Sequence, residues 1–346
     1  MTAMKPITIV GGGLAGLTLG IGLRRNGVPV TLWEAGRYPR HRVCGEFISG
    51  RGQETLARFD LLEPLHRAGA RGADTAAFFS ANCSTGPRPL PARAIGLSRF
   101  TLDASLANQF RELGGDLQEG VRRTESVAEG MVRATGRHAP PVVHGPCWFG
   151  LKAHARNVPL SADLEMHVFS GGYVGLCRVD GGRVNVCGLF RRRTGEKKPP
   201  SDWRERLRGP AGSVLRQRLD GAEFDLNSFC AVAGLSLQPH RAIDRAECCI
   251  GDAITMIPPV TGNGMSMAFE SAELAIGPLV AWSRGDVPWD ETRQQIAGDC
   301  DAAFARRLAW AKWFQRLLLT PPLQAALVRL AARSRCFWQT AFEKTR

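Results

Sequence analysis

The stretch ITIVGGGLAG, residues 7–16, decides the fold of this chain. Its first four residues are apolar or β-branched and are typical of a buried strand. A turn rich in glycine follows directly, which predicts that the backbone approaches a bound group closely at this point. The glycines fit the spacing G-x-G-x-x-G and are Gly11, Gly13 and Gly16.

The residues after the glycines complete a strand–helix–strand unit. Largely apolar residues from Leu14 onward predict a helix that Asn26–Gly27 ends. A second strand is expected from Val28 to Trp33, and Glu34 closes it. The unit has the length, the strand and the terminal acid that a dinucleotide-binding fingerprint requires.

Each glycine has a separate role in this unit. The first permits the tight turn, the second lets the backbone approach a pyrophosphate, and the third lets helix and strand pack closely. The phosphates are expected at the helix N-terminus, beside Leu14 and Ala15, where N–H groups and the helix dipole favour anions. Glu34, next to Ala35, is placed to accept hydrogen bonds from a ribose diol, which favours FAD or NAD over NADP.

A second glycine-containing loop follows a strand near residue 250, in CIGDAITMIPPVTGNGMSMAFESAELA, residues 249–275. It resembles the FAD-dependent oxidoreductases of the hydroxylase and geranylgeranyl-reductase superfamily. That resemblance implies that the Gly251–Asp252 pair reaches the ribityl and pyrophosphate groups of FAD. It also implies that a loop and the start of a helix face the flavin ring, with the residues Pro259, Gly262, Gly264 and Met265.

Three further segments are similar to the same superfamily, in the same order. The segment EAGRYPRHRVCGEF, residues 34–47, resembles the geranylgeranyl-reductase branch, and LSRFTLDASL, residues 97–106, resembles the family's arginine and leucine–aspartate helix start. Residues 134–137, ATGR, resemble its second glycine-containing turn. The resemblance implies that these segments bring further residues to FAD, namely Arg42, Cys44, Gly45, Arg99 and Gly136.

The chain also departs from the family pattern. Ala253–Ile254–Thr255 stands where the family usually has Asp-Ala-Ala. Few residues separate Val121 from Val132, where family members have a longer β-meander, so the cover of the flavin domain is expected to be truncated. These departures leave the predicted phosphate site unchanged.

The expected fold class is α/β, with a Rossmann-like FAD-binding domain interleaved with a β-rich substrate domain and followed by C-terminal helices. The FAD-binding domain is predicted to comprise residues 1–72, 96–145 and 240–300. Residues 73–95 and 146–239 are assigned to the substrate domain, with a hairpin around Asp180–Gly182. Residues 301–346 are assigned to the C-terminal helices, which Pro321–Pro322 interrupt.

The composition of the chain indicates which partners the protein binds and in which cellular compartment it is found. The net charge of +13 comes from dispersed arginines without a nucleic-acid-binding module, so no nucleic acid is expected. Ten cysteines without framework spacing, and no signal peptide or membrane-spanning run, predict a cytoplasmic protein with reduced thiols. No set of histidines and cysteines has metal-ligand spacing, so no metal is expected. The basic, aromatic-rich C-terminal helices either pack on the substrate domain or touch the inner face of a membrane and admit a lipophilic substrate.

Three flavin reactions compete for the function. The preferred one is reduction or oxidation of a carbon–carbon double bond in an apolar substrate of prenyl, polyene or polyketide type. In the reductase branch the Cys-Gly pair lies near the flavin ring, so Cys44 is the candidate catalytic residue, as a proton donor. Glu46 and Tyr173 are candidate substrate-site residues, although Tyr173 is the only aromatic residue where the reductases have Tyr-x-Trp-x-Phe-Pro.

Other functions than chemistry at a carbon–carbon double bond also fit the sequence. One is a flavin hydroperoxide-type monooxygenase that uses NAD(P)H and O2. Halogenation is disfavoured because the Trp-x-Trp-x-Ile-Pro run of the related halogenases is missing. Because there is no second G-x-G-x-x-G, NAD(P)H is expected to bind transiently, or an electron-donor reductase supplies the electrons. A non-catalytic flavin-binding protein and a plain NAD-dependent dehydrogenase are the other readings.

Overall fold

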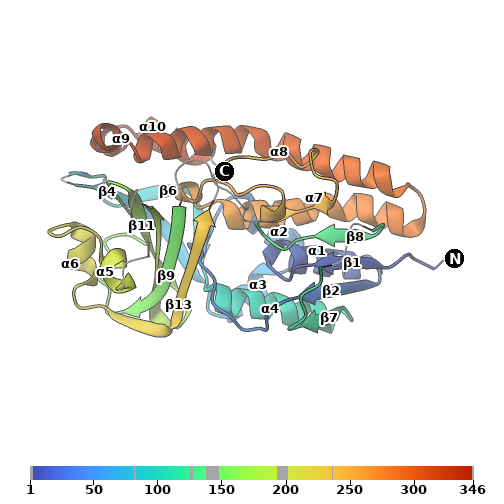
Figure 1. The fold of residues 1–346 in the computed structure, drawn as a ribbon. Helices are drawn as coiled ribbons and strands as arrows, with labels where there is room; N and C mark the ends of the chain where they lie inside the picture. Colours follow the sequence, from blue (N-terminus) through green and yellow to red (C-terminus); the bar gives the residue numbers. More distant parts are fainter. Residues whose placement is uncertain are drawn as a thin grey trace.

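The computed structural model describes residues 3–81, 83–124, 128–137, 148–192, 202–235 and 237–344. Two β-sheets stand side by side along the molecule, and a long helix, α8 (Trp289–Leu318), runs past both of them (Figure 1). The N-terminus lies at the end that holds the first sheet, and the last helices lie over the second sheet (Figure 1). This arrangement confirms the expected α/β class with a Rossmann-like sheet, a β-rich part and C-terminal helices.

The first sheet is parallel in every pairing, in the order β14-β8-β1-β2-β7. Parallel strands need crossover connections, and the helix α1 (Leu14–Arg25) supplies the first one. The predicted strand–helix–strand unit is confirmed, and Asn26 caps the helix as expected. The strands are β1 (Ile7–Val10), β2 (Val30–Glu34), β7 (Asp116–Glu119), β8 (Met131–Arg133) and β14 (Cys248–Cys249).

Helices cover this sheet and carry its core. The helix α1 is buried over most of its length and contacts both α4 (Arg99–Glu112) and α7 (Gly264–Arg284). Its near-continuous apolar sequence is what a helix buried between two neighbours requires. Two shorter helices, α2 (Arg51–Arg58) and α3 (Leu62–Arg67), complete this side.

The second sheet is mostly antiparallel and runs β13-β9-β12-β11-β10-β4-β6-β3, with β5 added to β4. Its one parallel pairing among the described strands joins β10 to β4. The predicted hairpin around residues 180–182 is confirmed, because β11 and β12 pair antiparallel across it. The strands are β3 (Phe47–Ile48), β4 (Arg71–Ser80), β5 (Cys83–Ser84), β6 (Arg88–Gly96), β9 (Trp148–Arg156), β10 (Leu164–Phe169), β11 (Gly172–Val179), β12 (Arg183–Arg191) and β13 (Glu223–Leu235).

The two faces of the second sheet differ in chemistry. One face is apolar and packs against α5 (Trp203–Arg208) and α6 (Val214–Leu219). Alternation along β9 and β12 sends Lys152, His154 and Asn185 to the opposite face, where their side chains contact residues 41–46. The polar face of the second sheet is therefore in contact with the segment that follows the first sheet's second strand.

The C-terminal region is helical, as predicted, and Pro321 begins a new helix after the break. The helices α9 (Pro321–Arg333) and α10 (Arg335–Lys344) lie over the second sheet (Figure 1). Within the described ranges, no helix combines the length and the apolarity that crossing a bilayer would take.

Residues 203–219 form the two helices α5 and α6, which Gly209–Pro210 separate, as these two helix breakers indicate. Most of the stretch 191–202 lies outside the described residues. The domain boundaries stay a prediction, and β3, at residues 47–48, belongs to the second sheet.

Candidate functional site

The glycine loop has the geometry that its sequence predicts. Gly11 has φ +111°, and a Cβ added there would lie 2.3 Å from the carbonyl oxygen of Ala134. A Cβ on Gly16 would lie 2.0 Å from the oxygen of Gly11, so helix and strand pack too closely for any side chain. A Cβ on Gly13 would meet nothing within 4 Å. The loop is thus tight on two sides and open at Gly13, where α1 begins without a side-chain cap.

Glu34 is buried at the end of β2 and fixes the loop. Its carboxylate accepts hydrogen bonds from the N–H groups of Gly12 and Gly36, at 2.8 and 2.7 Å, and pairs with Arg40 at 2.7 Å. Burial works to raise the pKa of Glu34, but the Gly36 N–H and Arg40 outweigh it and lower that pKa. A carboxylate offers about four acceptor positions, so Glu34 keeps capacity for a ribose hydroxyl. Ala35, which follows, is exposed.

The second predicted loop lies against the first. The helix α7 begins at Gly264, its N-cap side chain makes no capping hydrogen bond, and Met265 in its first turn is buried. A Cβ added at Gly251 would lie 2.9 Å from the Cβ of Ala15, so this loop touches the start of α1. Two helix N-termini without acidic residues in their first turns are therefore present in one region.

Asp252 carries the perturbed carboxyl group of this region. Its side chain is exposed to solvent, but surrounding protein atoms desolvate it and raise its pKa to about 6, against the charges of Arg99 and Arg137. Pro259, Gly262 and Gly264 are partly accessible along the same loop. Gly262 has φ +65°, a conformation that favours glycine, and faces the ring of Phe47.

The charge of Arg99 acts on both Asp252 and the Cys44 thiol. Arg99 forms two hydrogen bonds to Asp103, at 2.6 and 2.8 Å, which hold its guanidinium in place. Burial raises the pKa of the Cys44 thiol, against the opposing effect of Arg99. Arg42 lies 3.5 Å from both Glu34 and Asp103 and bridges the two acids. Gly45 is exposed, and a Cβ added there, or on Gly136, would meet nothing within 4 Å.

These positions fit a dinucleotide such as FAD. Three glycines present open backbone, and two helix starts offer N–H groups to a pyrophosphate. The carboxyl groups of Glu34 and Asp252 supply hydrogen-bond acceptors for hydroxyl groups of such a dinucleotide. We call this set the central site, namely Gly13, Glu34, Cys44, Gly45, Arg99, Gly136, Asp252, Gly262 and Gly264.

Glu46 lies beside the central site and is fully buried. Its carboxylate lies 2.6 Å from Nε2 of His154 and 3.1 Å from Nζ of Lys152, both fully buried as well. It also accepts a hydrogen bond from the N–H of Arg99 at 2.9 Å. Glu46 therefore reaches into the second sheet and not to Arg42, which pairs with Glu34 and Asp103.

Tyr173 lies away from the central site, inside an apolar cluster of the second sheet. Its neighbours there include Val168 and Leu189, and burial raises the pKa of its hydroxyl well above the usual value. The same cluster contains Val260, from the loop that leads to Gly262. Tyr173 is thus connected to the central site through packing.

Sequence reasoning missed Lys152, His154 and His41 as site residues. His154 is 108 positions from Glu46, and no spacing rule connects the two. The signal present was Lys152 itself, because the chain has six lysines and this one stands within the apolar strand WFGLKAHAR. A charged residue inside a buried strand indicates a buried partner.

Comparisons with known proteins agree with this geometry. The family model of an NAD(P)-binding Rossmann-like domain matches residues 9–43, which hold the glycine loop and Glu34. A search of curated protein sequences finds no match.

Solved structures resemble the whole chain at low sequence identity. The flavin-dependent brominase Bmp2 superposes with a TM-score of 0.72 at 18% identity, covering 96% of this chain and 94% of Bmp2. PqsL, a probable FAD-dependent monooxygenase from Pseudomonas aeruginosa, gives 0.71 at 17%, covering 94% and 99%. A mutant of the halogenase PltM in complex with FAD gives a TM-score of 0.70 at 13% identity, covering 98% of this chain and 85% of that one. The chain therefore has the fold of FAD-dependent flavoenzymes over nearly its full length.

Proposed function

We propose that the protein is an FAD-dependent oxidoreductase with the cofactor bound at the central site. One observation carries the proposal: two helix starts that lack acidic residues converge on open glycine backbone, with Asp252 beside them. The backbone N–H groups at Gly13 and Gly264 would hold the cofactor's anionic groups, and Glu34 and Asp252 its hydroxyls. FAD, when bound, supplies the two-electron redox chemistry of the reaction.

Oxygen-dependent chemistry is the first candidate for the reaction, as a monooxygenase. Its support is that PqsL, a probable FAD-dependent monooxygenase, shares the fold over nearly the full length of both chains. Halogenation has less support, although Bmp2 and PltM share the fold. The Trp-x-Trp-x-Ile-Pro run of the related halogenases is missing from the sequence.

Reduction of a carbon–carbon double bond is the second candidate, and Cys44 favours it. Its raised pKa keeps the thiol protonated at neutral pH, as a proton donor must be. Its neighbour Gly45 is exposed, so this segment is open to the central site. The thiol would deliver a proton to the carbon next to the one that receives the hydride.

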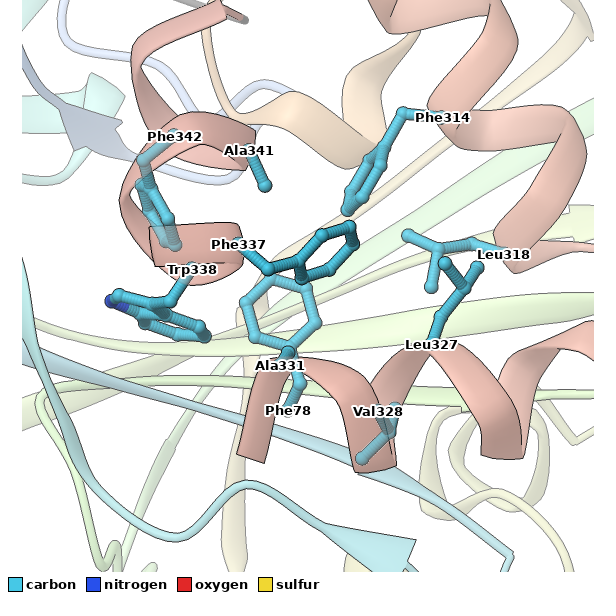
Figure 2. A pocket seen from close by; sticks show the side chains of 10 residues that line it. All are labelled: Phe78, Phe314, Leu318, Leu327, Val328, Ala331, Phe337, Trp338, Ala341 and Phe342. Carbon is cyan, nitrogen blue, oxygen red and sulfur yellow. The ribbon is translucent and has the colours of Figure 1, made fainter. Parts of the chain in front are cut away.

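The wholly apolar lining of a small cavity beneath the C-terminal helices favours an apolar ligand, and the cavity of about 30 Å³ would have to widen to admit one. Figure 2 shows aromatic rings from β4, α8 and α10 converging on it, among them Phe78, Phe314 and Phe337. The cluster that includes Phe78 and Phe314 also contains Val260, from the loop before Gly262. Packing therefore connects part of the pocket's lining with a loop of the central site. Its lining residues are Phe78, Phe314, Leu318, Leu327, Val328, Ala331, Phe337, Trp338, Ala341 and Phe342.

The proposal also includes an electron donor and a cellular location for the protein. NAD(P)H would bind transiently or a partner reductase would supply electrons, because the one fingerprint of the sequence is assigned to FAD. The exposed apolar side chains Trp313, Leu323 and Leu330 on α8 and α9 support peripheral contact with the inner face of a membrane. We place the protein in the cytoplasm on the basis of its scattered cysteines.

The visible absorbance spectrum of the purified protein tests the proposal. Oxidised-flavin bands, present as isolated or after addition of FAD, are expected, and their bleaching by NADPH without air would identify a direct nicotinamide donor. Admitting O2 then separates the two reactions by their products, since a monooxygenase transfers one atom of O2 to its product, whereas a reductase adds only hydrogen. A flavin that binds but is never reduced would leave a non-catalytic flavin-binding protein, and a protein that binds no FAD would refute the proposal.

A further inference from the structure

A cluster of four ionisable groups, of which Glu46, Lys152 and His154 are fully buried and His41 is partly buried, joins the second sheet to residues 41–46. Lys152 contacts both Oε1 of Glu46, at 3.1 Å, and Nδ1 of His41, at 3.2 Å. His154 approaches the other carboxylate oxygen of Glu46 at 2.6 Å. Burial, together with the charges of Lys152 and His154, lowers the pKa of His41 to about 4, so its neutral ring accepts the hydrogen bond from Lys152. We call Glu46, Lys152, His154 and His41 the buried ionic cluster.

Within the cluster the Glu46 carboxylate is compensated, whereas Nδ1 of His154 is buried without a hydrogen-bond partner among the described residues. Burial works to raise the pKa of Glu46, but the hydrogen bond from His154 and the charge of Lys152 outweigh it and lower that pKa. Both oxygens of the carboxylate have partners, and the N–H of Arg99 is one of them. Removing one member would leave its partner as an isolated charge without water, which is the costly state for a buried ion pair.

The backbone at Glu46 shows what the cluster holds in place. Glu46 has φ +56°, a left-handed conformation that is strained for a residue with a side chain. Such strain persists only where the surroundings fix it, and the contacts to Lys152 and His154 do so here. The N–H of Glu46 points to Sγ of Cys44 at 3.4 Å, and Asn185 donates to the oxygen of Cys44 at 2.9 Å.

We propose that Glu46 and Lys152 are positioning residues that set the electrostatics and the geometry of Cys44 and Gly45 at the central site. Burial is the main cause that raises the pKa of the Cys44 thiol; the charge of the Glu46 carboxylate adds to it, whereas Arg99 and the hydrogen bond from the Glu46 N–H oppose it. Lys152 lies 3.1 Å from that carboxylate and carries the opposite charge. The pair thereby balances a negative and a positive charge next to the residues that would face the cofactor. This inference rests on the proposed function for its meaning, but its first readout needs no cofactor.

The experiment compares Glu46→Gln, Lys152→Met and the double variant that carries both. Gln keeps the size of Glu, and Met keeps most of the length of Lys, so the double variant removes both charges with little change of volume. The rate at which a neutral alkylating reagent modifies Cys44 is followed by mass spectrometry in the FAD-free full chain. Cys336, which is exposed, serves as the internal control in every sample.

The two single variants are expected to change the rate of Cys44 alkylation in opposite directions. Glu46→Gln leaves Lys152 uncompensated, favours the thiolate and speeds modification several-fold, whereas Lys152→Met slows it. The double variant returns close to the wild-type rate. Faster modification in both single variants would mean that the segment had only loosened, and it would overturn the proposal. If a single variant does not fold, as circular dichroism would show, the comparison of the remaining one with the double variant decides.

The reduction potential of bound FAD is the second readout. Loss of the carboxylate in Glu46→Gln is expected to make the potential less negative, and loss of the ammonium in Lys152→Met more negative. Equal reduction potentials of bound FAD in the wild type, both single variants and the double variant would overturn the proposal that Glu46 and Lys152 set the electrostatics of the central site. A wild-type chain without FAD affinity would refute the proposed function alone, because the alkylation result still decides whether the pair controls Cys44.

Discussion

Arg307 of α8 forms two hydrogen bonds to the carboxylate of Glu270 in α7, at 2.7 and 2.5 Å, with both side chains almost fully buried. A bidentate pair of this kind fixes the distance and the rotation between two helices. Since α7 starts at the central site and α8 extends to the apolar pocket, this contact connects the two regions rigidly.

Replacing Arg307 with Met is expected to lower the free energy of unfolding by about 3 to 5 kcal/mol, because the buried Glu270 would keep only the exposed Arg51, 4.0 Å away, as a charged partner. Urea unfolding followed by circular dichroism measures the change. The matched control is Arg58→Met, whose partner Glu273 is partly exposed, and there a loss of about 1 kcal/mol or less is expected. Equal losses in the two variants would contradict the role given to burial.

Gly13→Ala is expected to weaken FAD binding by about tenfold or more, because its methyl group would fill the open side of the loop. The fold itself should tolerate the change, since Gly13 has extended backbone dihedrals that alanine adopts, and unfolding should shift by at most about 1 kcal/mol. Titration with FAD, followed by flavin fluorescence, gives the affinity. Gly298→Ala, in an exposed part of α8, is the control and should leave that affinity unchanged.

The Asp252 carboxyl predicts a pH effect on the cofactor-free protein. Its pKa rises from 3.8 to about 6 in the folded chain, so the folded state holds this proton more tightly than the unfolded state. The resulting stabilisation is complete below pH 3.8 and is lost as the pH rises through about 6. Asp252→Asn should therefore be more stable than wild type at neutral pH, with the difference vanishing in acid, while it binds FAD more weakly. Thermal unfolding across this pH range checks the sign.

Cys44→Ala tests the reductase candidate. The variant is expected to retain flavin bands, because the backbone at Gly45 and Asp252 is untouched, and to turn over more slowly by about two orders of magnitude, the contribution typical of a positioned proton donor. Stopped-flow measurement of flavin reoxidation by substrate is the readout. Unchanged turnover would remove the catalytic role of the thiol and leave oxygen-dependent chemistry as the candidate.

Membrane contact through the C-terminal helices predicts binding to vesicles that contain anionic lipids. Trp313 and Leu330 are 49% and 47% exposed, and replacing either with Glu should reduce the bound fraction in sedimentation. Leu226, 59% exposed on β13, offers a matched control, and Leu226→Glu should bind like wild type. If all three variants bind the vesicles equally well, the membrane contact lies elsewhere on the protein.

Local signals in the sequence predicted the first sheet's opening unit closely. The spacing of Gly11, Gly13 and Gly16 was sufficient to predict the loop, and Gly16 packs directly on the backbone of Gly11. The break after Leu318 was predictable as well, because Pro321 acts on its own helix. The approach of Gly11 to Ala134, which is distant in the chain, became visible only in the structure.

Contacts between residues far apart in the chain could not be predicted from the sequence. The pairing of β4 with β10 joins segments far apart in the chain, and neither strand carries a signal for the other. The same holds for Glu46, Lys152 and His154, which are brought together by the sheet and not by any motif. Single histidines and lysines have many ordinary roles, so their function becomes visible only with their partners.

The order of strands in the first sheet has a consequence for synthesis of the protein. The strand β1 leaves the ribosome first, yet its sheet is completed by β14, at residues 248–249 of 346. Until then a nascent chain exposes the free edge of β8 and the face of α1 that α7 later covers. Neither loop of the central site can therefore mature by itself during translation, and prematurely terminated chains should be substrates for chaperones and proteases.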